Sequence, residues 1–164
     1  PWRTIEENAA LGLEVQGMRR AEARARVREW FPRFGLDGFE KALPFELSGG
    51  MRQRAALLRT VVQERSTLLL DEPFGALDSL TRQEMQQWLQ EMWAGNEWTA
   101  LLITHDVREA VMLSDRVVVL GPRPATVREI VEVDLPRPRG VEQLASPAFA
   151  ELERRILELL HAQG

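Results

Sequence analysis

Thr67-Leu68-Leu69-Leu70-Asp71-Glu72 is a continuous apolar run that ends in two carboxylates, and this stretch decides the fold class. A run without polar alternation is typical of a strand that is buried on both faces of a parallel sheet. Similar runs span Thr99 to Thr104 and Val117 to Leu120. Helical patterns over about residues 79–94 and 107–113 separate the three runs. Strands that alternate with helices predict an α/β fold, in which a parallel sheet is flanked by helices and joined by right-handed crossovers.

The first third of the chain has the pattern of helices. Thr4 and Glu7 form a capping-box pattern at the start of a short helix. A stronger helix is expected over about residues 20–34, where apolar side chains recur at helical spacing, and Gly35 supplies a stop signal. A long helix with one apolar stripe is expected after Ser48.

The last third contains a further strand and a helix. We expect a more amphipathic strand over Val127 to Val133 and a linker over Pro136 to Gly140. Ser146-Pro147 then starts a final helix, with serine as the cap and proline in the first turn. The predicted parts are therefore a helical part over residues 1–65, the sheet over 66–135, and a linker with a helix over 136–164.

Composition places the chain among ordinary globular proteins. Its 164 residues are 45% hydrophobic and 28% charged, which is enough for one sizeable core. The absence of cysteine excludes disulfides and thiolate metal sites, and a net charge of -4 gives no basic footprint for nucleic acid. No apolar run approaches the roughly 18 residues of a membrane-spanning helix, so we expect membrane contact only through a partner. Pro1-Trp2 reads as the middle of a domain, and we expect a fragment of a longer protein.

Three side chains with useful chemistry follow the predicted strands. Asp71 and Glu72 end the first strand, and His105 follows the second. Because ligands bind beyond the carboxyl ends of parallel strands, we expect these side chains to face one region. Asp71 suits Mg²⁺, which prefers oxygen ligands, and Glu72 suits the activation of water during phosphoryl transfer. Taken singly, Asp71 and Glu72 could also be a solvated strand end or a helix cap. His105 could likewise be an ordinary loop residue.

A glycine-rich helix start lies ahead of the first strand. Leu47-Ser48-Gly49-Gly50-Met51-Arg52-Gln53-Arg54 places two glycines where the long helix begins. Glycine lets the backbone come close to a ligand, and the free N–H groups together with the helix dipole attract an anion. The simpler interpretation is a helix with a serine cap. Asp78, likewise, is a good cap for the helix that follows it.

The order and spacing of these segments resemble the ATP-binding subunit of ABC transporters. LSGGMRQR (47–54) resembles the ABC signature, TLLLDEPFGALD (67–78) resembles the Walker B strand with the D-loop, and LLITHD (101–106) resembles the switch-histidine segment. Together with EAVMLSDRVVVL (109–120), these segments extend the resemblance over nearly the whole chain. The resemblance is strongest to the importer branch that serves nitrate, sulfonate, taurine and related small solutes.

The resemblance implies a P-loop NTPase core of the RecA-like type, with the ABC α-helical subdomain at the N-terminal end of this chain. It implies ATP and Mg²⁺ as cofactors, catalytic roles for Glu72 and His105, and a metal-binding role for Asp71. The cofactor-binding residues that it implies are Ser48, Gly49, Gly50, Gln53 and Asp78. In this family the signature serine and glycines face the γ-phosphate of ATP that a second subunit holds.

The resemblance also implies partners and a location. Two ATP-binding subunits pair head to tail as a homodimer, and transmembrane permease subunits dock through a coupling helix on the helical region, here residues 1–65. A solute-binding protein acts indirectly. The implied location is the cytoplasmic face of the bacterial inner membrane, where the full-length protein would hydrolyse ATP to power the uptake of small solutes.

Two motifs of that family, the Walker A loop and the Q-loop, do not occur in the 164 residues. A Walker A loop has the pattern G-x-x-x-x-G-K-[ST], and Lys41, the only lysine, lacks both the glycines before it and the Ser or Thr after it. We therefore expect the chain alone to be inactive. The alternative is a truncated, non-catalytic ABC module that acts through subunit or membrane-partner contacts. A DNA-repair or chromosome-organising ATPase is disfavoured, because there is no sustained heptad run and the net charge is negative.

Overall fold

The computed structural model describes residues 1–94 and 98–161, and the chain divides into two compact units. The first unit comprises Pro1–Leu69, Pro73–Met85 and Trp98–Leu101, and the second comprises Leu70–Glu72, Gln86–Glu97 and Leu102–Gly164. Three elements contribute residues to both units: β1 (Thr67–Asp71), α4 (Ser79–Ala94) and β2 (Thr99–Ile103). Among the described residues, no helix combines the length and the apolar character that a membrane crossing requires.

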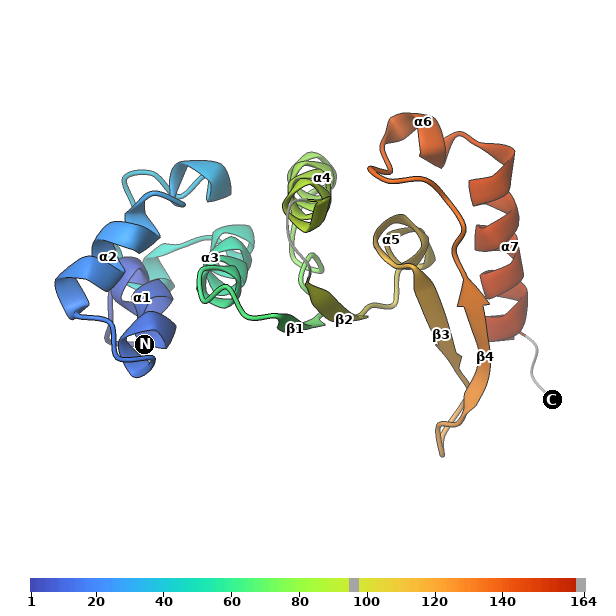
Figure 1. Cartoon of the computed structure of the whole chain (residues 1–164), viewed down its shortest axis with the longest axis horizontal. Coiled ribbons are helices and arrows are strands. Elements are labelled where there is room, and N and C mark those ends of the chain that lie inside the picture. Colours follow the sequence, from blue (N-terminus) through green and yellow to red (C-terminus); the bar gives the residue numbers. More distant parts are fainter. Residues whose placement is uncertain (95–97, 162–164) are drawn as a thin grey trace. The chain divides into compact units, whose positions relative to one another are not determined.

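Helices build the first unit up to β1 (Figure 1, blue to green). They are α1 (Ile5–Val15), α2 (Arg20–Arg28), the short 3-10 helices η1 (Pro32–Phe34) and η2 (Pro44–Glu46), and α3 (Gly49–Val61). α1 packs against both α2 and α3, and Leu13, Val27 and Leu58 are buried in this unit. The expected capping box opens α1, because Glu7 N–H donates to Thr4 Oγ1 at 3.3 Å and Thr4 N–H donates to Glu7 Oε2 at 3.1 Å.

The helix expected over residues 20–34 is shorter than predicted. α2 ends at Arg28, and η1 begins at Pro32. Proline has no N–H to donate, and its ring clashes with the carbonyl four residues earlier, which here belongs to Arg28. Gly35 does supply a stop, since it takes a left-handed φ of 56° directly after η1.

β1 and β2 pair with each other as parallel strands. Thr99 N–H donates to the Ser66 carbonyl at 2.8 Å, and Glu72 N–H donates to the Ile103 carbonyl at 2.9 Å. The paired positions therefore advance in the same direction along both strands, as the alternation of strands and helices predicts.

The expectation that these strands are buried on both faces is wrong. Leu68 and Leu70 are buried, whereas Leu69 between them is 70% exposed. Leu101 and Ile103 on β2 are also exposed. Because successive side chains of a strand point to opposite faces, the described residues cover one face of this sheet and leave the other open.

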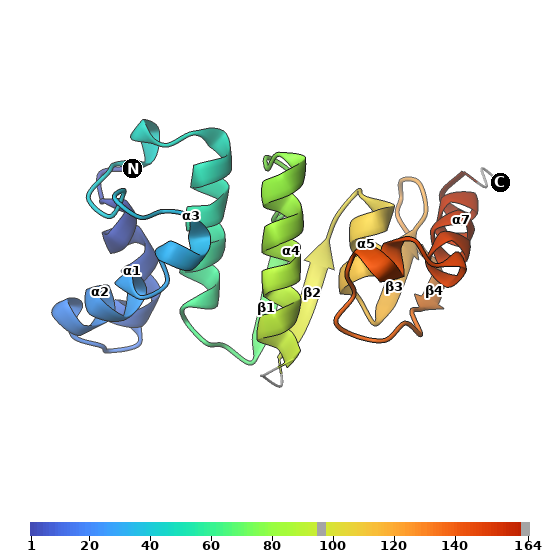
Figure 2. The same ribbon diagram turned by 90° about the horizontal axis from the view of Figure 1, so that it is seen from above.

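A hairpin and three helices make up most of the second unit. Their bounds are α5 (Val107–Leu113), β3 (Arg116–Leu120), β4 (Val127–Glu132), α6 (Val141–Leu144) and α7 (Pro147–His161). α7 packs against α5, β3 and β4, and both views show it alongside β4 (Figures 1 and 2). Phe149 and Ile156 are the buried residues of α7, and Ser146 caps this helix as expected, since its Oγ accepts from Phe149 N–H at 3.2 Å.

β3 departs from the expected parallel sheet. It pairs antiparallel with β4, with Val118 opposite Ile130, and the two strands form a separate two-stranded sheet. Only a short loop joins β3 to β4, whereas a parallel neighbour needs a crossover of about a dozen residues or more. The chain therefore turns back on itself here.

The segment Pro136 to Gly140, expected to be a linker, contains a buried arginine. Arg139 is 1% exposed, and the Gln90 side chain forms two hydrogen bonds with its backbone. Arg139 N–H donates to Gln90 Oε1, and Gln90 Nε2 donates to the Arg139 carbonyl, both at 2.8 Å. The segment is therefore fixed to α4. An arginine between proline and glycine belongs to no periodic apolar pattern, so its burial could not be predicted from the sequence.

Candidate functional site

Glu72 and His105 lie at the ends of neighbouring parallel strands, within the second unit. Glu72 directly follows β1, and His105 comes shortly after β2. Nδ1 of His105 lies 2.9 Å from Oε1 of Glu72. The side chains remain open to solvent, with exposed fractions of 75% for His105 and 52% for Glu72. The structure thus brings the carboxylate and the imidazole together, as expected for the carboxyl ends of adjacent strands.

Glu72 has a backbone conformation that side chains rarely adopt. Its φ is 44°, in the left-handed region, where Cβ approaches the following carbonyl oxygen at a cost of about 1–2 kcal/mol. The hydrogen bond from its N–H to the Ile103 carbonyl holds the residue in place. Strain of this kind persists only where the surrounding structure fixes it, and it is concentrated at active sites.

The carboxylate of Glu72 raises the pKa of His105 above its usual value of 6.5. The hydrogen bond between the two side chains is the largest cause, and the charge of Glu72 is the next. Asp106 and Glu109 act in the same direction, and partial desolvation opposes them. A raised pKa favours the imidazolium form, in which both ring nitrogens are donors. One nitrogen can then face Glu72 while the other can donate to an anion.

Asp71 is the last residue of β1 and is exposed. Proteins usually bind Mg²⁺ through one or two carboxylates together with substrate phosphates and water. Over residues 1–94 and 98–161, no group of three or more acidic, histidine or cysteine side chains could hold a metal ion. The carboxylate of Asp71 suits Mg²⁺ as one oxygen ligand among others.

The glycine-rich helix start belongs to the first unit. Ser48 is the N-cap of α3, and Met51 N–H donates to its Oγ at 3.2 Å. The serine-cap interpretation is thus correct, and Ser48 and Gly49 are exposed. Because the first N–H groups of a helix have no intrahelical partner, this exposed turn is chemically suited to an anion as well.

A hydrogen bond joins α3 to the turn between β1 and α4, again within the first unit. Ala76 N–H donates to Gln53 Oε1 at 2.8 Å. Gly50 faces the same turn, because a Cβ at this position would lie 3.5 Å from the Ala76 carbonyl oxygen. Gln53, which we expected among the cofactor-binding residues, therefore uses its amide oxygen inside the chain. No sequence signal indicates this contact, since the two residues are 23 positions apart.

Asp78 caps α4, which was the simpler of its two interpretations. Thr81 N–H donates to Asp78 Oδ1 at 3.0 Å. Hydrogen bonds from the backbone of Thr81, and then from its side chain, hold the pKa of Asp78 below the usual value. The structure thus gives this carboxylate a role in the helix, and a role toward nucleotide rests on the resemblance.

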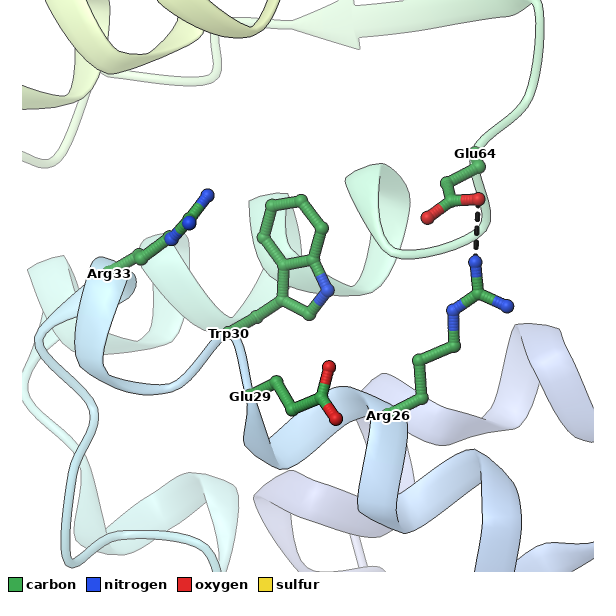
Figure 3. A pocket seen from close by; sticks show the side chains of 5 residues that line it. All are labelled: Arg26, Glu29, Trp30, Arg33 and Glu64. Carbon is green, nitrogen blue, oxygen red and sulfur yellow. Dashed lines mark hydrogen bonds and ion pairs between the residues drawn. The ribbon is translucent and has the colours of Figure 1, made fainter.

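A surface pocket of about 460 Å³ in the first unit contains none of these residues (Figure 3). It is lined by Arg26, Glu29, Trp30, Arg33 and Glu64. Arg26 donates to Glu64 at 2.6 Å, and the guanidinium of Arg33 lies 5.5 Å from the centre of the Trp30 ring. Both arginines of the pocket therefore interact with other residues that line it.

Known proteins match both the sequence and the fold. A family model for ABC transporters matches residues 1–75. An uncharacterized ABC transporter ATP-binding protein of Methanocaldococcus jannaschii is 44% identical over 98% of this chain and 59% of the relative. The aliphatic sulfonates import ATP-binding protein SsuB of Bacillus cereus is 39% identical over 100% of this chain and 63% of the relative. The chain is thus similar to ABC transporter ATP-binding proteins over nearly its whole length.

Other members of the ABC family extend the comparison. The taurine import ATP-binding protein TauB of Rhizobium johnstonii is 43% identical over 99% of this chain and 64% of the relative. A dimeric bacterial ABC transporter cassette has a similar structure, with a TM-score of 0.73 and 29% identity, over 82% of this chain and 59% of that chain. This likeness confirms the expected α/β fold class. The chain thus spans about 60% of the length of these relatives.

Proposed function

We propose that this chain is part of an ATP-binding subunit that hydrolyses ATP to power the import of small solutes. The observation that carries the proposal is the contact of 2.9 Å between Glu72 and His105 at the ends of two parallel strands. Such strand ends are where open α/β sheets bind their ligands. Relatives named as sulfonate and taurine import proteins support the direction of transport and the class of solute.

Each side chain of the pair has a task that its geometry supports. Glu72 is suited to orient and deprotonate the attacking water, because it is an exposed carboxylate at the strand end. His105 is suited to donate to a phosphate oxygen through Nε2 while Nδ1 faces Glu72. In this contact the negative carboxylate of Glu72 keeps the positive imidazolium of His105 in place. The positive charge suits a transition state whose negative charge lies on phosphate oxygens.

The metal and the second subunit complete the proposal. Asp71 would hold Mg²⁺, which neutralises charge that develops on the phosphates when it is bound. The exposed start of α3, with Ser48, Gly49 and Gly50, would contact ATP held by a second copy in a homodimer. Gln53 and Asp78 would support that face through the turn between β1 and α4.

The remaining partners follow from the family. Permease subunits would bind the helical part over residues 1–65 through a coupling helix, and a solute-binding protein would deliver the solute to them. The protein would then act at the cytoplasmic face of the cell membrane. The three expected parts, residues 1–65, 66–135 and 136–164, would serve as the helical subdomain, the core and the C-terminal linker with its helix.

Replacing Glu72 tests the proposed catalysis. In the full-length protein, Glu72→Gln should lower ATP turnover by at least about 100-fold, because the water loses its base. The affinity for ATP should stay within about twofold, because the amide keeps the size of the side chain. Glu84→Gln, at an exposed position of α4, serves as the control and should keep full turnover. An equal loss of ATP binding in Glu72→Gln would contradict the proposal.

The 164-residue chain by itself should not hydrolyse ATP. It contains no G-x-x-x-x-G-K-[ST] loop to hold the β- and γ-phosphates. Release of phosphate from ATP by the purified chain, compared with the full-length protein at equal concentration, checks this. Turnover at a similar rate would show that phosphate binding does not need that loop.

A further inference from the structure

Helix α5 carries His105 just ahead of its first turn, and it is short. Asp106 is its N-cap and accepts from Glu109 N–H at 3.1 Å through Oδ1. The helix then runs only from Val107 to Leu113. A helix of this length is not stable by itself in water, so its position depends on contacts along its sides and at its ends. Any shift of α5 as a body also moves the residues that precede it.

The C-terminal end of α5 is held by two arginines from the segment between β4 and α6. Nη1 of Arg139 donates to the carbonyls of Val111 at 2.8 Å and Ser114 at 2.6 Å. Nη2 of Arg137 donates to the carbonyl of Leu113 at 2.8 Å. The last carbonyls of a helix lack intrahelical partners and carry partial negative charge, so two guanidinium groups satisfy and stabilise this end.

Arg139 also reaches the residues that follow β4 in the chain. Its Nη2 donates to the carbonyls of Val133 and Leu135, both at 3.1 Å. The only carboxylate near this group among the described residues is that of Asp115, at 3.9 Å. A buried guanidinium surrounded mainly by backbone oxygens is costly to place, and the hydrogen bonds to these carbonyls offset that cost. Arg139 therefore connects the end of α5 to the segment that follows β4.

The other end of this connection is α4. Gln90 is 2% exposed, and its amide pairs with the backbone of Arg139 through the two bonds described above. Gln86, one turn earlier on α4, donates to the buried carboxylate of Glu109 on α5 at 3.0 Å. α4 thus supports α5 directly through Gln86 and indirectly through Arg139.

We propose that Arg139 is a positioning residue for His105, because it fixes the helix whose first turn follows the histidine. The inference rests on the proposed function, in which His105 contacts the phosphates of ATP. It assigns a task in catalysis to a residue far from the nucleotide chemistry in sequence. It also means that the segment from Pro136 to Gly140 helps to position His105.

A double-mutant cycle on ATP turnover by the full-length protein tests this inference. Arg139→Met should lower kcat by about 10- to 100-fold with KM for ATP within about twofold, since a displacement of about 1 Å can cost that much. In a His105→Ala background, the same change should have little further effect, because its target is already absent. Arg123→Met, at an exposed position of the loop between β3 and β4, is the matched control and should leave kcat unchanged.

Gln90→Ala provides a second test of the inference if Arg139→Met fails to fold. It removes both bonds to the Arg139 backbone and keeps the guanidinium. It should lower kcat in the same direction by about 3- to 10-fold, and this loss should also vanish in the His105→Ala background. Circular dichroism must show that each variant is folded at the assay temperature.

The outcomes separate this inference from the function on which it rests. Suppose that His105→Ala lowers kcat and that Arg139→Met or Gln90→Ala lowers it by the same factor again in the His105→Ala background. Arg139 then acts elsewhere, and the inference is wrong. An unchanged kcat in both the Arg139 and Gln90 variants would also overturn it. If His105→Ala alone leaves kcat unchanged, the proposed function fails and the inference falls with it.

Discussion

At the scale of single residues, the pair of Glu72 and His105 makes a direct prediction about titration. The pKa of His105 is raised chiefly by its hydrogen bond to Glu72, so Glu72→Gln should lower that pKa toward the usual 6.5. An NMR titration of the His105 ring in the 164-residue chain measures this, with His161→Gln used to assign the two histidine signals. An identical pKa in the chain with and without the Glu72 carboxylate would show that the contact is not formed in solution.

The same pair predicts how stability depends on pH. A histidine whose pKa is raised on folding stabilises the folded chain below its unfolded pKa, and this contribution is lost as pH rises through the raised value. The melting temperature of the chain should therefore exceed that of Glu72→Gln more at about pH 6 than at about pH 9. A larger difference at the higher pH would contradict this sign.

The left-handed backbone of Glu72 predicts that any side chain at this position lowers the stability of the fold. Glycine adopts a positive φ without strain, so Glu72→Gly should be more stable than Glu72→Ala by about 1 kcal/mol. Asp71 lies on a strand, where the order should reverse, and Asp71→Gly with Asp71→Ala is the matched control. Urea unfolding of the four variants gives both differences. Equal stabilities of the two Glu72 variants would mean that residue 72 does not hold its φ of 44° in solution.

At the scale of elements, the bond between Gln53 and Ala76 joins α3 to the turn that leads into α4. Gln53→Ala should lower the free energy of unfolding by about 1 kcal/mol, because the Ala76 N–H loses its acceptor. Gln53→Glu keeps an acceptor oxygen and should lose less. Gln83→Ala, at an exposed position of α4, is the control for the loss of a glutamine side chain. Chemical denaturation of the 164-residue chain measures all three variants, and equal effects of Gln53→Ala and Gln83→Ala would argue against the bond.

The ends of elements were predictable wherever one residue decides them. Thr4, Ser48 and Ser146 cap helices as their residue types indicate. Glu72 and His105, at the ends of neighbouring parallel strands, lie together as expected. The end of α2 could have been predicted too, because Pro32 excludes helical bonding to Arg28.

Other features depend on residues that no local pattern links. The pairing of β3 with β4 in a sheet separate from β1 and β2 depends on a choice of neighbouring strand, which the apolar run of β3 does not indicate. The exposure of Leu69 depends on which face of the sheet is covered, and an apolar run cannot indicate this. The contacts of Gln53 with Ala76 and of Gln90 with Arg139 join polar residues 23 and 49 positions apart. Polar contacts over such separations arise from the fold and leave no periodic signal.

At the scale of the whole molecule, the proposed homodimer depends on the exposed start of α3. In the full-length protein, Ser48→Arg should abolish dimerisation driven by ATP, because a bulky side chain would occupy the place where a phosphate must approach the helix start. Gln16→Arg, at an exposed position after α1, adds the same side chain away from that helix start and should leave dimerisation intact. Light scattering with and without ATP measures the effect. A dimer of Ser48→Arg that forms as readily as that of the unaltered protein would count against the proposed contact.

The amide of Gln90 and the backbone of Arg139 also limit how proteins of this kind can be recombined. A chimera that keeps residues 1–135 and takes its tail from a relative without an arginine at position 139 would leave the carbonyls at the end of α5 without donors. Lysine would not restore them, because a single ammonium cannot reach carbonyls that the planar guanidinium spans. Exchange of the tail should therefore succeed only when glutamine at position 90 and arginine at position 139 are inherited together.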